Sequence, residues 1–378
     1  MLECVRVMDK QEQQFWVAFG RVPQIGRARF SLLEAHFGNL EDAWKASPAD
    51  LQQAGLSGAA LSALLAARDA VSPAEELERI ERAGVQAVTW HDEAYPAGLS
   101  EIFDRPPVLY VRGKLASADD WSVSIVGTRR ATVYGRQAAE ELAIGLAQNN
   151  VTVVSGLARG IDSVAHKAAL QAGGRTIAVL ACGLDLVYPP ENHKLAQEII
   201  AAGGALVSDY PLGTQPKSEH FPRRNRIMVG LSLGVLVIEG DLKSGAMITA
   251  RLALDENREV FAVPGSIYTP TFRGTNWLIQ NGHAKLVTRV EDVLEELNLT
   301  MAAHQMEAKE LLPADNTEAL LLRCLSAEPI HIDDVRRKSD LPIDAVSSAL
   351  AMLELKGMVR HVGNMNYVRA VRTPASVS

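Results

Sequence analysis

The sequence is poor in cysteine. Its 378 residues contain only Cys4, Cys182 and Cys324, which lie far apart along the chain. This spacing excludes a disulfide framework and the paired cysteines of a structural zinc site. We therefore expect a protein of the reducing cytoplasm that binds no metal.

Long apolar runs and a targeting segment are also missing. The most apolar stretch, 176–181, is far shorter than the roughly 20 residues that cross a bilayer. The first residues show no basic region followed by an apolar one, so we expect neither a secretory signal nor contact with a membrane.

The chain has no excess of positive charge. Its formal net charge is −7, which argues against a protein that coats nucleic acid by bulk electrostatics. The charge is unevenly distributed, however. Residues 121–226 contain 11 Lys and Arg against 8 Asp and Glu, whereas residues 1–84 contain 9 against 12. A local basic pocket on an acidic protein is consistent with this distribution.

The apolar pattern divides the chain into three regions and a linker. Residues 1–84 show helical spacing and predict a small helical domain. Residues 85–300 alternate apolar runs with helical stretches, residues 301–316 form a polar linker, and residues 317–372 predict a winged helix.

A short turn in the first region has two interpretations. In "PQIGRARFSLLEAHFG", Gly26 opens a helix that Gly38 can stop. Helix-hairpin-helix modules use such a turn to present backbone N–H groups to a DNA phosphate. The alternative, which we favour for a single copy of the pattern, is a helical bundle in which Gly26 serves only the turn.

The middle region predicts an α/β fold with a doubly wound parallel sheet, because continuous apolar strands alternate with helices. Prolines at 96, 106 and 107 are expected to keep the preceding connector out of helix. The strand candidates are "VSIVG", "VTVVSG", "TIAVLACG", "ALVSDY", "GVLVIEG" and "EVFAVPG".

The last region has the element order of a winged helix-turn-helix. Its expected recognition helix, 342–356, has Asp344 near its start and contains no arginine. Reading of the major groove normally uses Arg, Lys, Asn or Gln at such positions. We therefore expect this domain to contact protein, or DNA only weakly.

In a doubly wound sheet, ligands bind at the carboxyl ends of the strands. The first strand is followed by Gly127, Thr128, Arg129 and Arg130, where a dinucleotide site would have G-x-G-x-x-G. NAD binding is therefore disfavoured, and Arg129 is expected to hold a phosphate instead. The role of Arg130 is left open, and a surface charge is the simpler interpretation.

The turns after later strands carry further polar groups. Ser155, Gly156 and Gly160 predict an anion cradle at a helix start, and Asn192 is the expected cap of a helix with Lys194 in its first turn. Further along, three more arginines surround an asparagine, and a Ser-Gly pair precedes a helical threonine. These are Arg223, Arg224, Asn225, Arg226, Ser244, Gly245 and Thr249. Together the turns predict a site for several phosphates.

Signatures of catalysis are missing. The sequence has no P-loop, no G-x-S-x-G and no H-E-x-x-H. His166 reads as a capped or partly buried helix histidine, and Cys182 as a small buried residue. Asp162 and Asp185 remain a candidate carboxylate pair. We expect no cofactor and no enzymatic activity.

With these turns assembled, the chain resembles the DNA-processing protein A family, also called DprA or Smf, over nearly its whole length. The stretches that carry the resemblance are "YPAGLSEIFDRPPVLYVRG", "SIVGTRRATVYG", "VVSGLARGIDSVAHKAAL", "LACGLDLVYPPENHKL", "FPRRNRIMVGLS", "VIEGDLKSGAMITARLA", "FAVPGSI" and "GTNWLIQNGH".

The resemblance implies an extended Rossmann-like domain between an N-terminal helical (SAM- or helix-hairpin-helix-like) domain and a C-terminal winged helix. It implies binding of single-stranded DNA, loading of a RecA-type recombinase during natural transformation, and a homodimer formed through the Rossmann-like domain. The family's motif residues correspond to Arg129, Lys194, the segment 224–226, and Ser244 with Gly245. Some members have an aromatic residue for base stacking where this chain has Gln197.

Two points stay open after the resemblance. Stacking on bases rests on Tyr188 or Phe221, or is weak. The alternative function is a Rossmann enzyme that cleaves nucleoside monophosphates. Such enzymes carry P-G-G-x-G-T followed by acids, whereas residues 263–267 read Val-Pro-Gly-Ser-Ile.

Overall fold

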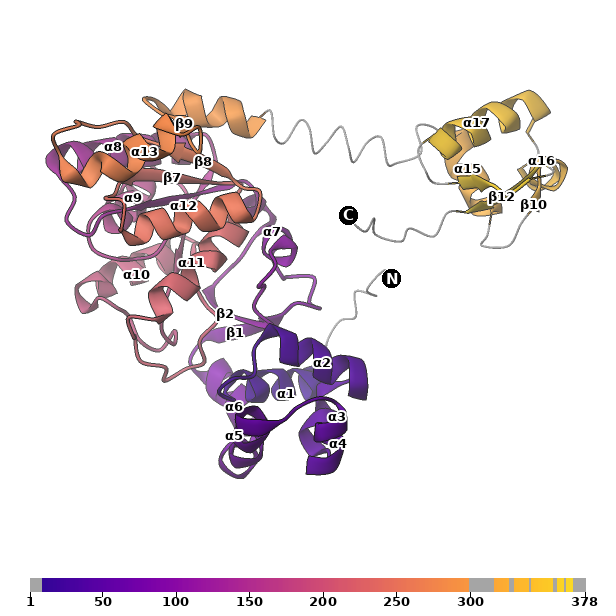
Figure 1. Cartoon of the computed structure of the whole chain (residues 1–378), viewed down its shortest axis with the longest axis horizontal. Helices are drawn as coiled ribbons and strands as arrows, with labels where there is room; N and C mark the ends of the chain where they lie inside the picture. Colours follow the sequence, from indigo (N-terminus) through magenta and orange to yellow (C-terminus); the bar gives the residue numbers. More distant parts are fainter. Residues whose placement is uncertain are drawn as a thin grey trace. The chain divides into compact units, whose positions relative to one another are not determined.

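The computed structural model forms two compact units, the larger within Cys4–Leu294 and the smaller within the segment from Glu295 to Ser378 (Figure 1). It describes residues 9–298, 316–325, 330–339, 341–355, 359–363 and 365–369. The linker expected at 301–316 lies outside these residues, apart from Asn316.

The larger unit begins with a helical region, as predicted. Polar N-cap side chains start several of its helices: the Asp9 carboxylate accepts from the Glu12 N–H at 2.7 Å, and the Gly38 backbone, at φ 78°, ends a helix in the left-handed region. Trp16, Phe19 and Phe30 fill its core. The helices are α1 (Lys10–Gly20), α2 (Arg27–Phe37), α3 (Leu40–Lys45), α4 (Pro48–Gln53), α5 (Gly58–Ala70) and α6 (Pro73–Arg82).

A nine-stranded sheet follows, in the order β1-β2-β6-β5-β4-β3-β7-β8-β9. The six predicted strands are β3 to β8, and all their pairings with one another are parallel. The bounds are β1 (Val85–Thr89), β2 (Val108–Gly113), β3 (Ser122–Gly127), β4 (Thr152–Ser155), β5 (Thr176–Val179), β6 (Ala205–Ser208), β7 (Gly234–Glu239), β8 (Glu259–Ala262) and β9 (Lys285–Leu286).

The proline-rich connector differs from its prediction. Helix α7 (Ala97–Glu101) begins directly after Pro96, which stands at its N-cap, because a residue without an N–H is tolerated at a helix start. Strand β2 begins just after Pro107 and pairs antiparallel with both β1 and β6. Strands β1 and β2 therefore join the helical region to the parallel sheet.

Helices pack on the strands of the parallel sheet. Helix α9 and helix α11 both contact β3, β4 and β5, while α8 packs against α9 and α12 against α11. This arrangement confirms the doubly wound α/β fold. The helices are α8 (Val133–Gln148), α9 (Ile161–Gln171), α10 (His193–Ala201), α11 (His220–Leu231), α12 (Gly245–Asp255) and α13 (Arg273–Gln280).

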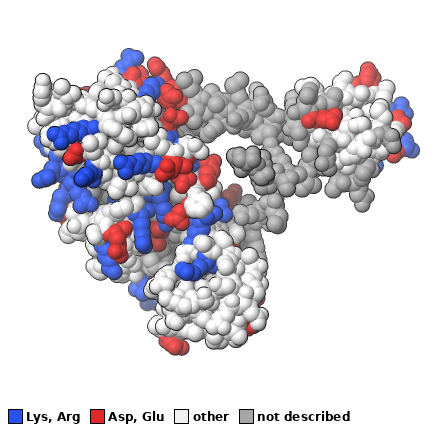
Figure 2. Space-filling view, in the orientation of Figure 1, with Lys and Arg blue, Asp and Glu red and all other residues white. Residues whose placement is uncertain are grey.

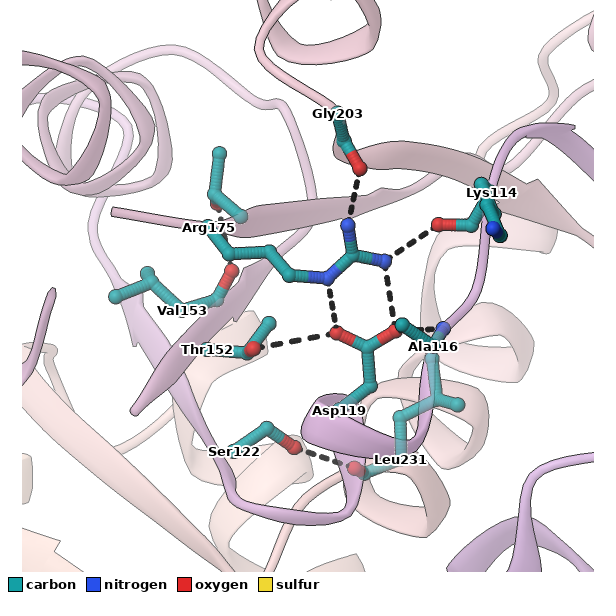
Figure 3. A network of polar contacts seen from close by, with 10 residues as sticks. Lys114, Ala116, Asp119, Ser122, Thr152, Val153, Arg175, Gly203 and Leu231 are labelled. Atoms are coloured by element: carbon teal, nitrogen blue, oxygen red, sulfur yellow. Dashed lines mark hydrogen bonds and ion pairs between the residues drawn. The ribbon is translucent and has the colours of Figure 1, made fainter. Parts of the chain in front are cut away.

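The amino-terminal edge of the sheet is held by one ion-pair network (Figure 3). The Arg175 guanidinium donates to both oxygens of Asp119 and to the carbonyls of Lys114 and Gly203. Asp119 also accepts from the Thr152 hydroxyl at 3.2 Å. Because this network ties together the starts of β3, β4, β5 and β6, it belongs to the scaffold, and the opposite edge remains for ligand binding.

The smaller unit has the element order of a winged helix, as predicted. Its sheet has the order β10-β12-β11, and Val335, Val346 and Leu350 lie in its buried core. The elements are α15 (Asn316–Cys324), β10 (Ile330–His331), α16 (Ile332–Ser339), α17 (Ile343–Leu355), β11 (Val359–His361) and β12 (Asn366–Arg369). The expected recognition helix is α17, with Asp344 in its first turn.

Among the helices that the structure describes, none combines the length and the apolar character needed to cross a membrane.

Candidate nucleic-acid interface

A pocket of about 610 Å³ lies at the carboxyl edge of the sheet, and we call it the central pocket. Lys and Arg side chains gather over the sheet-bearing part of this unit, whereas the visible face of helices α1 to α5 is mostly uncharged (Figure 2). The residues that line the central pocket are Val126, Gly127, Thr128, Arg129, Ala158, Asp162, Tyr188, Pro216, Ser218, Phe221, Pro222, Arg224, Asn225, Met228, Ser244, Gly245, Ala246 and Thr249.

The turn after β3 forms one wall of the pocket. A Cβ atom on Gly127 would lie 2.4 Å from the Ile161 side chain, so only glycine lets the turn approach helix α9. The Thr128 N–H donates to the Glu239 carbonyl at 2.7 Å, which ties the turn to the end of β7. Both residues, which follow the first predicted strand, line the pocket.

Arg129 and two aromatic residues form the exposed part of the pocket. The guanidinium carbon of Arg129 lies 4.9 Å from the centre of the Phe221 ring, and the rings of Phe221 and Tyr188 are 5.7 Å apart. Tyr188 is 40% exposed. A cation and accessible aromatic faces therefore lie together, and both are groups that bind a nucleic acid strand. Arg130 is exposed and does not line the pocket.

Arg224 forms the floor of the pocket and is almost completely buried, at 3% exposed. Its guanidinium donates to the Gly156 carbonyl at 2.8 Å and to the Val179 carbonyl, and its Nε donates to the Asn225 side chain at 3.3 Å. These contacts hold a positive charge in place beneath the pocket. Asn225 lines the pocket beside it.

The turn after β4, which was predicted to bind an anion, instead binds the carboxylate of Asp162. The Asp162 carboxylate accepts from the N–H groups of Gly156 and Ala158 at 3.2 and 3.3 Å, and the Ser155 hydroxyl donates to the Ile125 carbonyl at 2.6 Å. Neither Ser155 nor Gly156 lines the pocket. Gly156 instead makes room for Arg224, whose guanidinium a Cβ atom would meet at 2.5 Å.

The start of helix α12 forms the opposite wall. Ser244 is its N-cap residue, and the Ser244 hydroxyl oxygen is buried without a hydrogen-bond partner in the described part of the chain. Gly245 leaves the helix N-terminus open, which favours an anion. The Thr249 hydroxyl donates to the Gly245 carbonyl at 3.2 Å. All three residues line the pocket.

Lys194 and Arg226 lie outside the pocket lining. The Lys194 side chain is 87% exposed and its nearest acidic partner is Glu198, 3.5 Å away. Arg226 is paired with Asp104 at 3.1 Å and with Asp209. Asn192 is the N-cap residue of α10, as predicted, but its side chain makes no capping hydrogen bond: its amide donates instead to the Leu157 carbonyl and the Ser163 hydroxyl, because the chain folds back onto helix α9.

Burial shifts the ionisation of the groups beneath the pocket. It raises the pKa of the Asp162 carboxyl and lowers the pKa of the Arg224 guanidinium, while the attraction between the two charges opposes both shifts. Burial also raises the pKa of Cys182 to about 11. Cys182 is thus a buried thiol, as expected.

His166 makes folding sensitive to acid. Burial, aided by the Arg224 charge, lowers its pKa to about 3, and its Nδ1 lies 2.7 Å from the Thr176 hydroxyl. The unfolded chain takes up this proton near pH 6.5 but the folded chain does not, so the free energy of unfolding falls as the pH drops below 6.5. We expect this group to contribute a loss of about 2 kcal/mol between pH 7 and pH 5.

Urea unfolding at pH 7, 6 and 5 measures this contribution. The H166N variant should show a smaller decrease on acidification than the original chain, whereas H193N, at an exposed position on α10, should match it. An identical pH dependence in H166N and the original chain would contradict the assignment.

The other candidates for catalysis do not combine into a site. The Asp185 carboxylate accepts from the Gly213 N–H at 2.8 Å, whereas Asp162 serves the turn after β4, so the two carboxylates have separate partners. Within the described residues, no group of three or more His, Cys, Asp or Glu side chains could hold a metal ion.

Seven lining residues are absent from the sequence prediction: Val126, Ala158, Pro216, Ser218, Pro222, Met228 and Ala246. They are apolar or small and carry no motif of their own. Pro216, Ser218, Pro222 and Met228 are placed by the packing of the loop after β6 and of helix α11 against the sheet, so no local pattern could have identified them.

The family models agree with the two-unit organisation. A model described as DNA recombination-mediator protein A matches residues 86–298, and one described as the DprA winged helix domain matches residues 305–364. Protein Smf of Synechocystis sp. is 36% identical, over 96% of this chain and 100% of its own. DNA processing protein DprA of Streptococcus pneumoniae is 47% identical, over 54% of this chain and 72% of its own.

Two solved structures share the fold. The X-ray structure of DprA from Streptococcus pneumoniae has a TM-score of 0.64 at 34% identity and covers 77% of this chain and 99% of its own. DprA from Helicobacter pylori, described for its single-stranded DNA binding mode, has a TM-score of 0.51 at 34% identity, over 58% of this chain and 98% of its own. The chain therefore belongs to the DNA recombination-mediator protein A family and carries that family's winged helix domain at its C-terminal side.

Proposed function

We propose that this chain is a recombination mediator that binds single-stranded DNA in the central pocket and carries out no chemistry on it. The observation that carries the proposal is the stacking of Arg129 on the Phe221 ring, which itself contacts Tyr188, in the pocket lined by the buried Arg224. The relative from Helicobacter pylori, described for binding single-stranded DNA, supports it.

Each group has a defined part in this proposal. Arg129, which is exposed, contacts a phosphate directly, while the buried Arg224 and the open N-terminus of α12 make the pocket attractive to anions. The exposed ring of Tyr188 stacks on a base, a contact worth about 1–3 kcal/mol. Duplex DNA hides its base faces, so the strand must be single.

Fluorescence anisotropy with labelled oligo-dT and with a duplex of equal length tests the proposal. We expect the single strand to bind at least about tenfold more tightly, with log K falling by about 0.7 per contacted phosphate for each unit of log salt. Equal or tighter binding of the duplex contradicts it. Release of free base from nucleoside monophosphates would instead favour the enzyme alternative.

We also propose that the protein forms a homodimer through its sheet-bearing unit and hands the strand to a RecA-type recombinase in the cytoplasm. The family's description as a recombination mediator supports the recombinase partner, and in a dimer two linked pockets would hold one strand with higher avidity than either alone. Light scattering measures the dimer. Recombinase filament growth on strands coated with a single-strand-binding protein measures the transfer.

A further inference from the structure

A second cavity of about 390 Å³ lies in the larger unit where the helical region meets the sheet. It is separate from the central pocket, although Pro222 lines both. We call it the second cavity. Its lining residues that matter here, from four parts of the chain, are Gly26, Arg27, Arg105, Tyr110, Asp209, Arg223 and Arg226.

Several residues that line the second cavity have a buried polar atom without a hydrogen-bond partner in the described part of the chain. Nine buried side-chain nitrogen and oxygen atoms lack a hydrogen bond in the described residues, and four of them belong to residues that line it. They are Arg27 Nε, Tyr110 Oη, Asp209 Oδ1 and Arg226 Nη1. The Tyr110 side chain is fully buried. Because an unpaired buried polar group costs about 1–3 kcal/mol, such a cluster indicates a site built for a polar ligand.

The charge of the lining favours an anion. Four arginines stand against two aspartates, Asp104 and Asp209, and both aspartates pair with Arg226. Positive charge from Arg27 and Arg223 remains, because neither forms an ion pair within the described residues. One of these, Arg27, opens helix α2, whose N-cap Gly26 makes no side-chain hydrogen bond and whose first turn has no acidic residue. A cation at this helix end is unfavourable unless an anion offsets it.

Helix α11 connects the two cavities. Arg223 and Arg226 are three residues apart and share one face of the helix, which lines the second cavity. Arg224 and Asn225, between them, line the central pocket. One helix start therefore directs polar side chains into both cavities, so a strand that leaves the central pocket past Pro222 meets the second cavity next.

We propose that the second cavity holds a further nucleotide of the same DNA strand, with its phosphate at Arg27 and Arg223 and its base beside Tyr110 and Asp209. The proposal rests on the proposed single-stranded DNA binding, which it extends. It assigns a ligand to the Gly26 turn of the helical region, where the phosphate would meet the first turn of α2.

The test compares oligo-dT of about two nucleotides, short enough to occupy the central pocket alone, with oligo-dT of about 20 nucleotides, which reaches both cavities. In the full chain, R27A and Y110F should lower affinity for the long strand about five- to tenfold and leave affinity for the short strand unchanged. R29A is the matched control: Arg29 lies on the same helix turn and is exposed, but it does not line the cavity, so both affinities should persist.

Three results would overturn the proposal. R27A and R29A could have the same effect on the long strand, or R27A could weaken the short strand equally. Alternatively, free thymidine monophosphate could bind the original chain but not R27A while long-strand affinity stays unchanged, which would make the cavity a site for a free nucleotide. If the original chain binds neither strand, the proposed function itself fails, which is a different outcome from these three.

Discussion

Replacing Arg129 with alanine is expected to lower affinity for oligo-dT about 10- to 100-fold. Its guanidinium is exposed at the mouth of the central pocket, over the Phe221 ring, and makes no ion pair within the described residues. A hydrogen bond from a charged donor to a phosphate is worth about 1.5–3 kcal/mol, which corresponds to this range. The slope of log K against log salt should shrink by about 0.7, the value of one phosphate contact.

The neighbouring Arg130 provides the matched control. It has the same charge and is also exposed, but it does not line the pocket, so R130A should bind within about twofold of the original chain. Circular dichroism should show that both variants are folded, because neither side chain is buried. An equal loss in R129A and R130A would mean that the DNA is held by general positive charge, and the assigned contact would be wrong.

Replacing Arg224 with methionine is expected to lower the free energy of unfolding by about 3–5 kcal/mol. The change keeps most of the side-chain volume but leaves the carbonyls of Gly156 and Val179 without a donor. It also leaves the Asp162 carboxylate, which is 7% exposed, without the positive charge beside it. Removing one partner from a buried pair of opposite charges has a cost of this size. Urea unfolding at pH 7 measures it.

A double-mutant cycle separates this charge effect from lost packing. D162N keeps an oxygen that can accept from the N–H groups of Gly156 and Ala158, but it removes the negative charge. The R224M/D162N chain should therefore be more stable than the sum of the single changes predicts, by about 1–2 kcal/mol. Strict additivity would show that the two charges do not interact, and that Arg224 acts only through its hydrogen bonds.

The six strands that could be predicted, β3 to β8, are those that pair parallel with one another. Strands β3 to β8 lie inside the parallel sheet, so their sequences are continuous apolar runs. Strands β1 and β2 were not predicted, because the prolines before β2 suggest a loop. Their place was decided by pairing: β2 pairs antiparallel with β6, and the two partners lie almost 100 residues apart.

The candidate site, too, could be predicted only in part. Strand ends indicated where polar groups would gather, and Gly127, Arg129, Arg224 and Ser244 do line one pocket. The sequence could not show that Asp162 occupies the cradle after β4, or that Arg226 turns to the second cavity. Neighbouring residues on a helix point in different directions, and their partners come from other segments.

From the sequence by itself, the order of apolar runs and glycine turns determined the doubly wound sheet, the flanking helical regions and the edge at which the polar turns gather, because these depend on local periodicity and on chain order. Only the tertiary structure decided which charges are available to a ligand. Arg129 is exposed in the pocket, Arg224 is committed to two carbonyls, and Arg226 is paired with acids. The reason is physical: the same guanidinium binds a phosphate or a protein oxygen, and which of the two it meets depends on the segments that fold against it.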